Sequence, residues 1–503
     1  MSTDGDANTH WAPWSLRYSG HQFGVWAGQL GDGRAISILA TPHPSDPELT
    51  YELQLKGAGR TPFSRTADGL AVLRSSIREF LCSEAMHALE IPTTRALALI
   101  SLPELPVHRQ RIEGACVLTR LAPSFLRIGS FEALNPPGNT FFIGGGQQDA
   151  HWDALTELGE WVGRRVLKLG PVKWDEGGAW GRELVMEVAR RNARMVAAWQ
   201  AYGFMHGVIN TDNVSVLGLT IDYGPYAFMD VFDPYHICNH SDQEGRYSYK
   251  DQPSMIIYAL RALLNALAPL IGAEAELGGK AVSRGWADDA SPEKLAAWRK
   301  SGLDLVKQDM ETATVEICAA EYSRLMHKRL ALRRLDTDDE TRLVRPLLNL
   351  MEEHALDFHG TFRRLAFFRP SMVSDAPQSD AFIAGVLALT SEPDRLDRQK
   401  AVVDWRAWLE RYAVRIMSER GEWSGEGDLD GKREAAAKAA NPRFVLRQWV
   451  LEEVIRTVEQ DADSGKRILR KVLQMACSPF EPWGAEGHDG SEDLLDAESD
   501  FSL

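Results

Sequence analysis

The chain has 503 residues and a formal net charge of −15, from 56 basic and 71 acidic residues. Its hydrophobic content of 44% and charged content of 25% are typical of a globular protein with room for more than one large core. The sequence is acidic overall and has no Lys/Arg-rich stripe that could bind phosphates, so we expect no nucleic-acid partner. Its five cysteines are scattered without a C-x-x-C pair, so neither a zinc ribbon nor a disulfide framework is indicated.

The most apolar stretch, residues 255–272, is interrupted by Arg261, Asn265 and Pro269. It therefore predicts a buried helix, and we expect no membrane partner. Residues 481–503 carry eight acids and no Lys or Arg, which predicts a disordered acidic tail. The N-terminal residues are polar and show neither a signal-peptide core nor an Arg-rich presequence.

Residues 20 to about 120 predict a series of short strands separated by glycine turns. Residues 51–56 alternate like a half-buried strand and end in Lys56, just before the flexible loop 57–59. A Lys in this position is a candidate phosphate ligand. Two further strands are expected at 96–102 and 116–121.

A helix is predicted over residues 71–89, where apolar residues recur at helical spacing. A kinase-type site needs a helix carboxylate to orient its strand Lys. Both Glu79 and Glu84 qualify, and the periodicity alone does not choose between them.

The most informative segment is residues 206–224, which holds the pair Asp212-Asn213 and then Asp222-Tyr-Gly. In a kinase-type site, an Asn and an Asp-x-Gly aspartate supply oxygens to metals that bridge the nucleotide phosphates. The catalytic Asp normally lies five residues before the Asn, and that position is Val208. Asp212 is then the nearby carboxylate that could accept a proton in its place.

The second half of the chain predicts mostly helices. A Pro/Gly-rich stretch at 135–148 is interpreted as a surface insertion, followed by helices at about 151–168 and 181–202. Amphipathic helical patterns then continue to about residue 476, with a loop at 421–431.

The pattern predicts an α+β class with a two-lobed, protein-kinase-like fold and additional C-terminal helices. The expected parts are a nucleotide-binding lobe (1–130), a helical catalytic lobe with the metal site (131–345), a C-terminal helical extension (346–480) and the acidic tail (481–503).

Several long motifs in the right order resemble the selenoprotein O family, a family of protein adenylyltransferases with a pseudokinase fold. The matching segments are residues 18–24, 29–34, 55–65, 71–79, 91–96, 206–224 and 238–242. Together they span roughly residues 15–255, and weaker similarity continues at 441–444.

The resemblance implies that ATP binds in the reverse of the kinase orientation. AMP is then transferred to Ser, Thr or Tyr hydroxyls of partner proteins. In this family pattern Glu79 orients the strand Lys. The residues implied to contact ATP are Gly31, Gly33, Arg34, Lys56, Asp68, Gly69, Arg120, Arg127 and Asp222.

The resemblance also gives the remaining site residues their roles. Arg120 and Arg127 match a basic pocket for the inward-pointing terminal phosphates. Asn213 and Asp222 match ligands of Mg²⁺ or Mn²⁺, and Asp212 matches the proton acceptor. We expect a monomer, located in mitochondria if the source is eukaryotic and in the cytoplasm otherwise.

The sequence departs from the family pattern in two places, and two alternative functions remain open. Only 17 residues precede Tyr18, where family members usually carry several tens, so the opening of the first lobe is expected to be short. The last cysteine, Cys477, is followed by an acidic tail, so a redox role does not carry over. The alternatives are a kinase that binds ATP in the usual orientation and a non-catalytic, nucleotide-binding scaffold.

Overall fold

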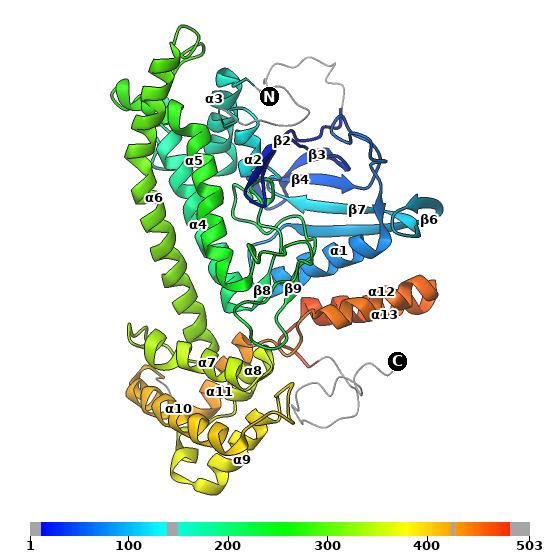
Figure 1. Cartoon of the computed structure of the whole chain (residues 1–503), viewed down its shortest axis with the longest axis vertical. Helices are drawn as coiled ribbons and strands as arrows, with labels where there is room; N and C mark the ends of the chain where they lie inside the picture. Colours follow the sequence, from blue (N-terminus) through cyan, green and yellow to red (C-terminus); the bar gives the residue numbers. More distant parts are fainter. Residues whose placement is uncertain (1–11, 138–148, 424–427, 483–503) are drawn as a thin grey trace.

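A computed structural model describes residues 12–137, 149–423 and 428–482. The described chain mixes helix and sheet, with most strands in the first quarter and helices dominating the rest, which confirms the α+β class (Figure 1). The predicted insertion falls largely on residues 138–148 and the acidic tail on 483–503, and both lie outside the described residues.

The first part of the molecule, here called the sheet unit, covers residues 19–122. A hairpin of β1 (Ser19–Gln22) and β2 (Val25–Gln29) precedes a five-stranded antiparallel sheet. The strands of this sheet are β3 (Ala35–His43), β4 (Asp46–Lys56), β5 (Ala71–Val72), β6 (Arg95–His108) and β7 (Ile112–Ala122). The strands predicted at 51–56, 96–102 and 116–121 are confirmed as parts of β4, β6 and β7.

Helix α1 (Leu73–Ala88) packs on this sheet and confirms the helix predicted at 71–89. Its apolar side chains Ile77, Leu81 and Met86 are buried in the main core. Burial of three such side chains stabilises the helix by several kcal/mol (about 1.5–3 each). This packing holds the helix against the sheet that carries Lys56.

The helical body follows from residue 128 onward (Figure 1). Its first helices are α2 (Ile128–Glu132), α3 (Trp152–Trp161) and α4 (Gly181–Ala201), and a π-helical turn extends α3 to Val166. Two long helices, α5 (Gln252–Glu276) and α6 (Pro292–Arg329), pack on α4. A short ladder of β8 (Phe204–Met205) and β9 (Ala227–Phe228) frames the segment between α4 and α5.

Within the described residues, one helix is long and apolar enough to cross a membrane by length and composition. It is α5 with its preceding turn, and 72% of its most apolar window is buried inside the protein. The buried helix predicted at 255–272 is therefore confirmed as part of α5, a core element.

The remaining helices form a group at the far end of the helical body, except for the last two. The group contains α7 (Arg345–Glu353), α8 (Phe358–Leu365), α9 (Ala376–Leu387), α10 (Arg398–Ser418) and α11 (Leu429–Ala440). Helices α12 (Gln448–Gln460) and α13 (Ala462–Cys477) run back to the sheet unit and pack beside α1 (Figure 1).

Candidate active site

A cavity of about 560 Å³ lies between the sheet unit and the helical body. The sheet unit supplies most of its wall, and the segment 222–224 supplies the opposite side. The predicted site residues that line it are Gly31, Gly33, Arg34, Lys56, Asp68, Gly69, Arg120 and Asp222. Arg127, Asp212 and Asn213 are not among the residues that line the cavity.

The strand register brings the polar groups of the cavity onto one face of the sheet. Side chains two apart on a strand share a face, so Gln54 and Lys56 of β4 point the same way. Gln54 is paired directly with Arg120 of β7, and both arginine nitrogens Nε and Nη2 donate to the Gln54 amide oxygen. A cross-strand pair of this kind fixes the guanidinium above the sheet.

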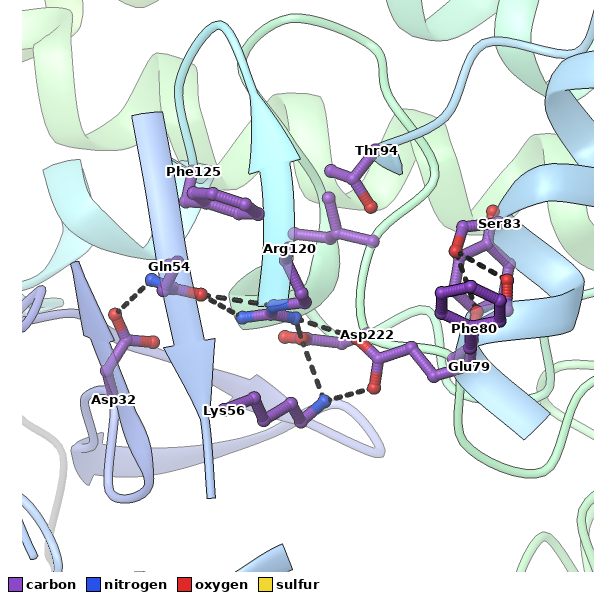
Figure 2. A network of polar contacts seen from close by, with 12 residues as sticks. Asp32, Gln54, Lys56, Glu79, Phe80, Ser83, Thr94, Arg120, Phe125 and Asp222 are labelled. Atoms are coloured by element: carbon purple, nitrogen blue, oxygen red, sulfur yellow. Dashed lines mark hydrogen bonds and ion pairs between the residues drawn. The ribbon is translucent and has the colours of Figure 1, made fainter. Parts of the chain in front are cut away.

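Glu79 of α1 joins the two cations, as Figure 2 shows. Lys56 Nζ lies 2.6 Å from Glu79 Oε2, and Arg120 Nη1 lies 3.1 Å from Glu79 Oε1. Burial raises the pKa of Glu79, but Lys56 and Arg120 outweigh burial and hold that pKa below its usual value. Glu79 is therefore an ionised carboxylate shared by two cations.

Glu84, the other candidate on the same helix, lies elsewhere. Its carboxylate receives hydrogen bonds from the Arg95 guanidinium at 2.6 and 2.9 Å and from the backbone N–H of Ala96. Five residues turn an α-helix by about 140° beyond a full circle, so two positions at this spacing face different neighbours. The structure thus places Glu79, and not Glu84, beside Lys56.

Asp222 is held by both predicted arginines. Arg120 Nη1 lies 2.6 Å from Asp222 Oδ1, and Arg127 Nη1 lies 2.6 Å from Asp222 Oδ2. Burial alone would raise the pKa of Asp222, but the arginines and Lys56 hold it well below its usual range. Asp222 also has a left-handed φ of 55°, a conformation that is costly for a residue other than Gly and that clusters at functional sites.

Arg127 is almost fully buried, with its side chain 1% exposed. Its guanidinium stacks on the Tyr18 ring at 4.4 Å, and Nη1 also donates to the Asp212 carbonyl. The second amine, Nη2, has no hydrogen-bond partner in the part of the chain that the structure describes and lies 3.8 Å from the Asp32 carboxylate. A buried guanidinium nitrogen without a partner is costly, which points to a ligand that completes its hydrogen bonds.

The glycine-rich loops form the remaining wall of the cavity. Gly69 has φ +76°, and a Cβ there would lie 2.2 Å from the Gly59 backbone, so this close approach requires glycine. The neighbouring Asp68 lies at the exposed rim and forms a two-point ion pair with Arg109, which lowers the pKa of Asp68 to about 2.

Asp212 and Asn213 lie in a single 3₁₀ turn after the buried segment 206–210. Strand β1 covers Asp212, and Gln22 donates to Asp212 Oδ2 at 3.1 Å. Asp212 Oδ1 is buried and accepts no hydrogen bond from any residue that the structure describes. Burial raises the pKa of Asp212 to about 6, so its carboxylate is mostly ionised near neutral pH and has one oxygen free to accept a proton.

The rest of the loop is held by backbone contacts. His206 packs flat against Trp199, and its Nε2 contacts the carbonyl oxygen of Ile221 at 2.9 Å, which braces the loop. Asn213 Nδ2 donates to the carbonyl of Val208, and its amide oxygen has no partner among the described residues.

The donor set suits a hard divalent cation. Asp222 presents a carboxylate and Asn213 an unpartnered amide oxygen, and oxygens of this kind are the ligands that Mg²⁺ and Mn²⁺ prefer. The two Asp222 oxygens each bind an arginine, but a carboxylate oxygen has a second lone pair for a metal. The residues present therefore fit such a metal.

Sequence reasoning missed four residues of this site: Tyr18, Asp32, Gln54 and Arg109 all contact a predicted site residue. Gln54 could have been found, because it precedes Lys56 by two positions on the same strand face. Asp32 lies between Gly31 and Gly33, and a Gly-Asp-Gly sequence is typical of a hairpin turn, so it gives no signal of a buried carboxylate. Tyr18 and Arg109 carry no comparable local signal.

Comparison with known proteins places the chain among the nucleotidyltransferases. A model of the family described as "Protein adenylyltransferase SelO" matches residues 4–476. The chain belongs to this family, as the resemblance predicted.

Curated relatives agree with this assignment. The chain is 39% identical over 485 residues to "Protein adenylyltransferase SelO, mitochondrial" of Schizosaccharomyces pombe, covering 94% of this chain and 78% of the relative. It is 40% identical over 483 residues to "Protein nucleotidyltransferase YdiU" of Cupriavidus metallidurans, covering 95% of this chain and 76% of the relative. A protein of the same name from Cupriavidus pinatubonensis is 41% identical over 473 residues, covering 92% of this chain and 78% of the relative.

Proposed function

We propose that the protein transfers AMP from ATP to Ser, Thr or Tyr hydroxyls of other proteins, in a kinase-like site where ATP lies reversed. The arrangement of the molecule supports a kinase-like architecture. A sheet unit with one helix carries Lys56 and Glu79, and a helical body carries Asp212, Asn213 and Asp222. The cavity lies between them.

The observation that carries the proposal is the buried arginine pair. Arg120 and Arg127 converge with Lys56 around Asp222, and their side chains are only 3% and 1% exposed. An ordinary kinase needs the strand Lys on the phosphates but no second and third buried cation behind it. Lys56 and Arg120 line the cavity, and Arg127 contacts Asp222 beside them. This gathering of cations favours the most highly charged part of ATP, its terminal phosphates, on that side of the cavity.

In this orientation the α-phosphate faces the acceptor. The acceptor oxygen forms a bond to the α-phosphorus, and the bond from that phosphorus to the bridging oxygen of the β-phosphate breaks. Pyrophosphate leaves with the electron pair, and the hydroxyl proton passes to the free Oδ1 of Asp212. Lys56, Arg120 and Arg127 stabilise the charge that builds on pyrophosphate.

Asn213 and Asp222 would hold Mg²⁺ or Mn²⁺, which supplies further charge neutralisation at the phosphates. Asp222 must then share its oxygens between the metal and the two arginines. Its low pKa keeps the carboxylate ionised for both kinds of partner.

The test compares transfer from α-labelled and γ-labelled ATP to protein, including self-labelling. We expect label only from the α position, and mass spectrometry should find an adenylyl group on a hydroxyl. Label from the γ position alone would establish the kinase alternative. Bound ATP without any transfer would establish the scaffold.

A further inference from the structure

A second cavity, of about 600 Å³, lies on the other side of β1 from the turn that carries Asp212 (residues 211–213). Its walls come from β1, α2, α5 and α6, and Figure 1 shows α2 next to α5 at the top of the helical body. Its polar lining residues include His21, Glu132, Tyr258, Arg261 and Arg299. None of them lines the first cavity, which carries Lys56 and Asp222.

Arg299 is a cation of this cavity without a counterion. Its Nη1 donates to the carbonyl of Asn265 at 2.9 Å and its Nη2 to the Asn135 amide oxygen at 3.4 Å. No carboxylate of the described chain forms an ion pair with it, and burial lowers the pKa of the Arg299 guanidinium. A partly buried guanidinium without a carboxylate is a binding site for an anion.

Arg261 adds a second guanidinium to the same wall. Among the described residues it contacts Glu311 only through Nε, at 2.7 Å, so within that part of the chain neither terminal amine of Arg261 has a partner. Two guanidiniums facing one cavity can bind a carboxylate through several N–H groups at once.

Glu132 gives the cavity an acceptor as well. Its side chain is 3% exposed, Oε1 lies 2.7 Å from His21 Nδ1, and Oε2 is buried and has no hydrogen-bond partner within residues 12–137, 149–423 and 428–482. Near neutral pH a free phosphate ion consists mainly of acceptor oxygens and has few protons to donate to Glu132. The Glu132 carboxylate therefore repels a phosphate ion. A peptide offers both an acidic side chain for the arginines and backbone N–H groups for Glu132.

The distance between this cavity and Asp212 suits a single extended peptide that reaches both. His21 and Gln22 are consecutive in β1, so their side chains lie on opposite faces of the strand. His21 lines the cavity, whereas Gln22 donates to Asp212 Oδ2 at 3.1 Å. Two side chains that extend in opposite directions from one strand end on the order of 10 Å apart, which an extended peptide spans in about three residues.

We propose that this cavity is a docking subsite for the acceptor protein, and that it takes an acidic side chain about three residues from the modified hydroxyl. The proposal rests on the proposed adenylyl transfer for its purpose. Its ligand chemistry, a peptide carboxylate on Arg261 and Arg299, does not depend on which nucleotide atom reacts.

The first experiment measures binding without chemistry. Fluorescein-labelled peptides with one Ser and either Glu or Gln three residues to one side are titrated with the full chain, and anisotropy is recorded. We expect the Glu peptide to bind about 10-fold more tightly than its Gln partner, and Arg299→Gln to remove that difference. Arg395→Gln is the control, because Arg395 is 80% exposed on the distant helix group and leaves the preference intact.

Inorganic phosphate is the competing probe. If phosphate at low millimolar concentration displaces the Glu and Gln peptides alike, or if the two peptides bind equally, the peptide subsite is refuted. Thermal unfolding of each variant shows whether Arg299→Gln is folded, and Arg299→Lys provides a second variant that keeps the charge but loses the two-point geometry.

The second experiment uses transfer from α-labelled ATP to the same peptides. Arg299→Gln should raise the KM for the Glu peptide about 10-fold and leave kcat and the KM for ATP unchanged. A fall in kcat with unchanged KM would contradict a docking role. Absence of any transfer by the unaltered protein would refute the proposed function, while the anisotropy result would still decide the subsite.

Discussion

Replacement of Glu79 by Gln tests the centre of the site most directly. Glu79 is 5% exposed, and its two oxygens bind Lys56 at 2.6 Å and Arg120 at 3.1 Å. Gln keeps the size of the side chain but removes the charge, and its amide group turns a donor toward one of the two cations. We expect Lys56 to lose its fixed position above the cavity.

The magnitude follows from the two contacts. A hydrogen bond to a charged group contributes about 1.5–3 kcal/mol, and both contacts of Glu79 are of this kind. If misplacement of Lys56 costs about 2–3 kcal/mol of transition-state stabilisation, transfer slows by about 30- to 150-fold. Breaking a buried pair also destabilises the fold by about 3–5 kcal/mol, so rates must be corrected for the folded fraction.

Glu84→Gln is the matched control, because it makes the same chemical change on the same helix. Glu84 is buried and binds Arg95, whose side chain is 37% exposed, so its loss should cost about 1–3 kcal/mol of stability and leave transfer per folded molecule unchanged. Initial rates from α-labelled ATP, divided by the folded fraction from circular dichroism, compare the two variants. A larger loss of transfer in Glu84→Gln than in Glu79→Gln would refute the assigned partner of Lys56.

Four further predictions test the rest of the molecule. Arg127→Gln should slow transfer about 30-fold or more, through a loss on the order of 2–5 kcal/mol, and unchanged rates would remove Arg127 from phosphate binding. Asp222→Asn should abolish metal-dependent ATP binding measured by calorimetry while the fold persists, and retained binding would exclude it as a metal ligand. Val208→Asp should give no transfer from γ-labelled ATP, since the terminal phosphates still point inward, and γ-label on protein would contradict the reversed orientation. Glu274 caps the start of α4 with both oxygens, and burial raises its pKa from 4.5 to about 7. The folded state then binds more protons than the unfolded state between these values, so stability should fall by up to about 3 kcal/mol as pH rises from 4.5 to 7. Urea unfolding of Glu274→Gln should lack this component, and an equal pH slope in both proteins would contradict it.

Local patterns sufficed for the elements that carry the site. The alternation of residues 51–56 identified β4 as a strand. Its polar side chains Glu52 and Gln54 are the buried ones, whereas Leu53 and Leu55 are half-buried. The apolar spacing of residues 71–89 identified α1, and α1 begins at Leu73 only because Ala71 and Val72 pair with β7. Periodicity could not choose between Glu79 and Glu84, since both are buried and each has its own cation.

Contacts between segments far apart in the chain could not be predicted from the sequence. Tyr18 stacks on Arg127, which follows it by more than a hundred positions, and Arg109 reaches back to Asp68. No spacing rule links such pairs, because they meet only after the sheet has formed. The second cavity could not be predicted from the sequence for the same reason, because its arginines come from two helices and its carboxylate from a third.

The return of the C-terminal helices to α1 has a consequence for catalysis. Arg78, next to Glu79, donates to Gln448 of α12 at 3.0 Å and to the carbonyl of Tyr226 at 3.2 Å. One residue thus ties α1 both to the C-terminal helices and to the segment that follows Asp222. The position of Glu79 then depends on α12 and α13, and the family match covers both helices, to residue 476 in the last turn of α13, far beyond the last residue of the cavity.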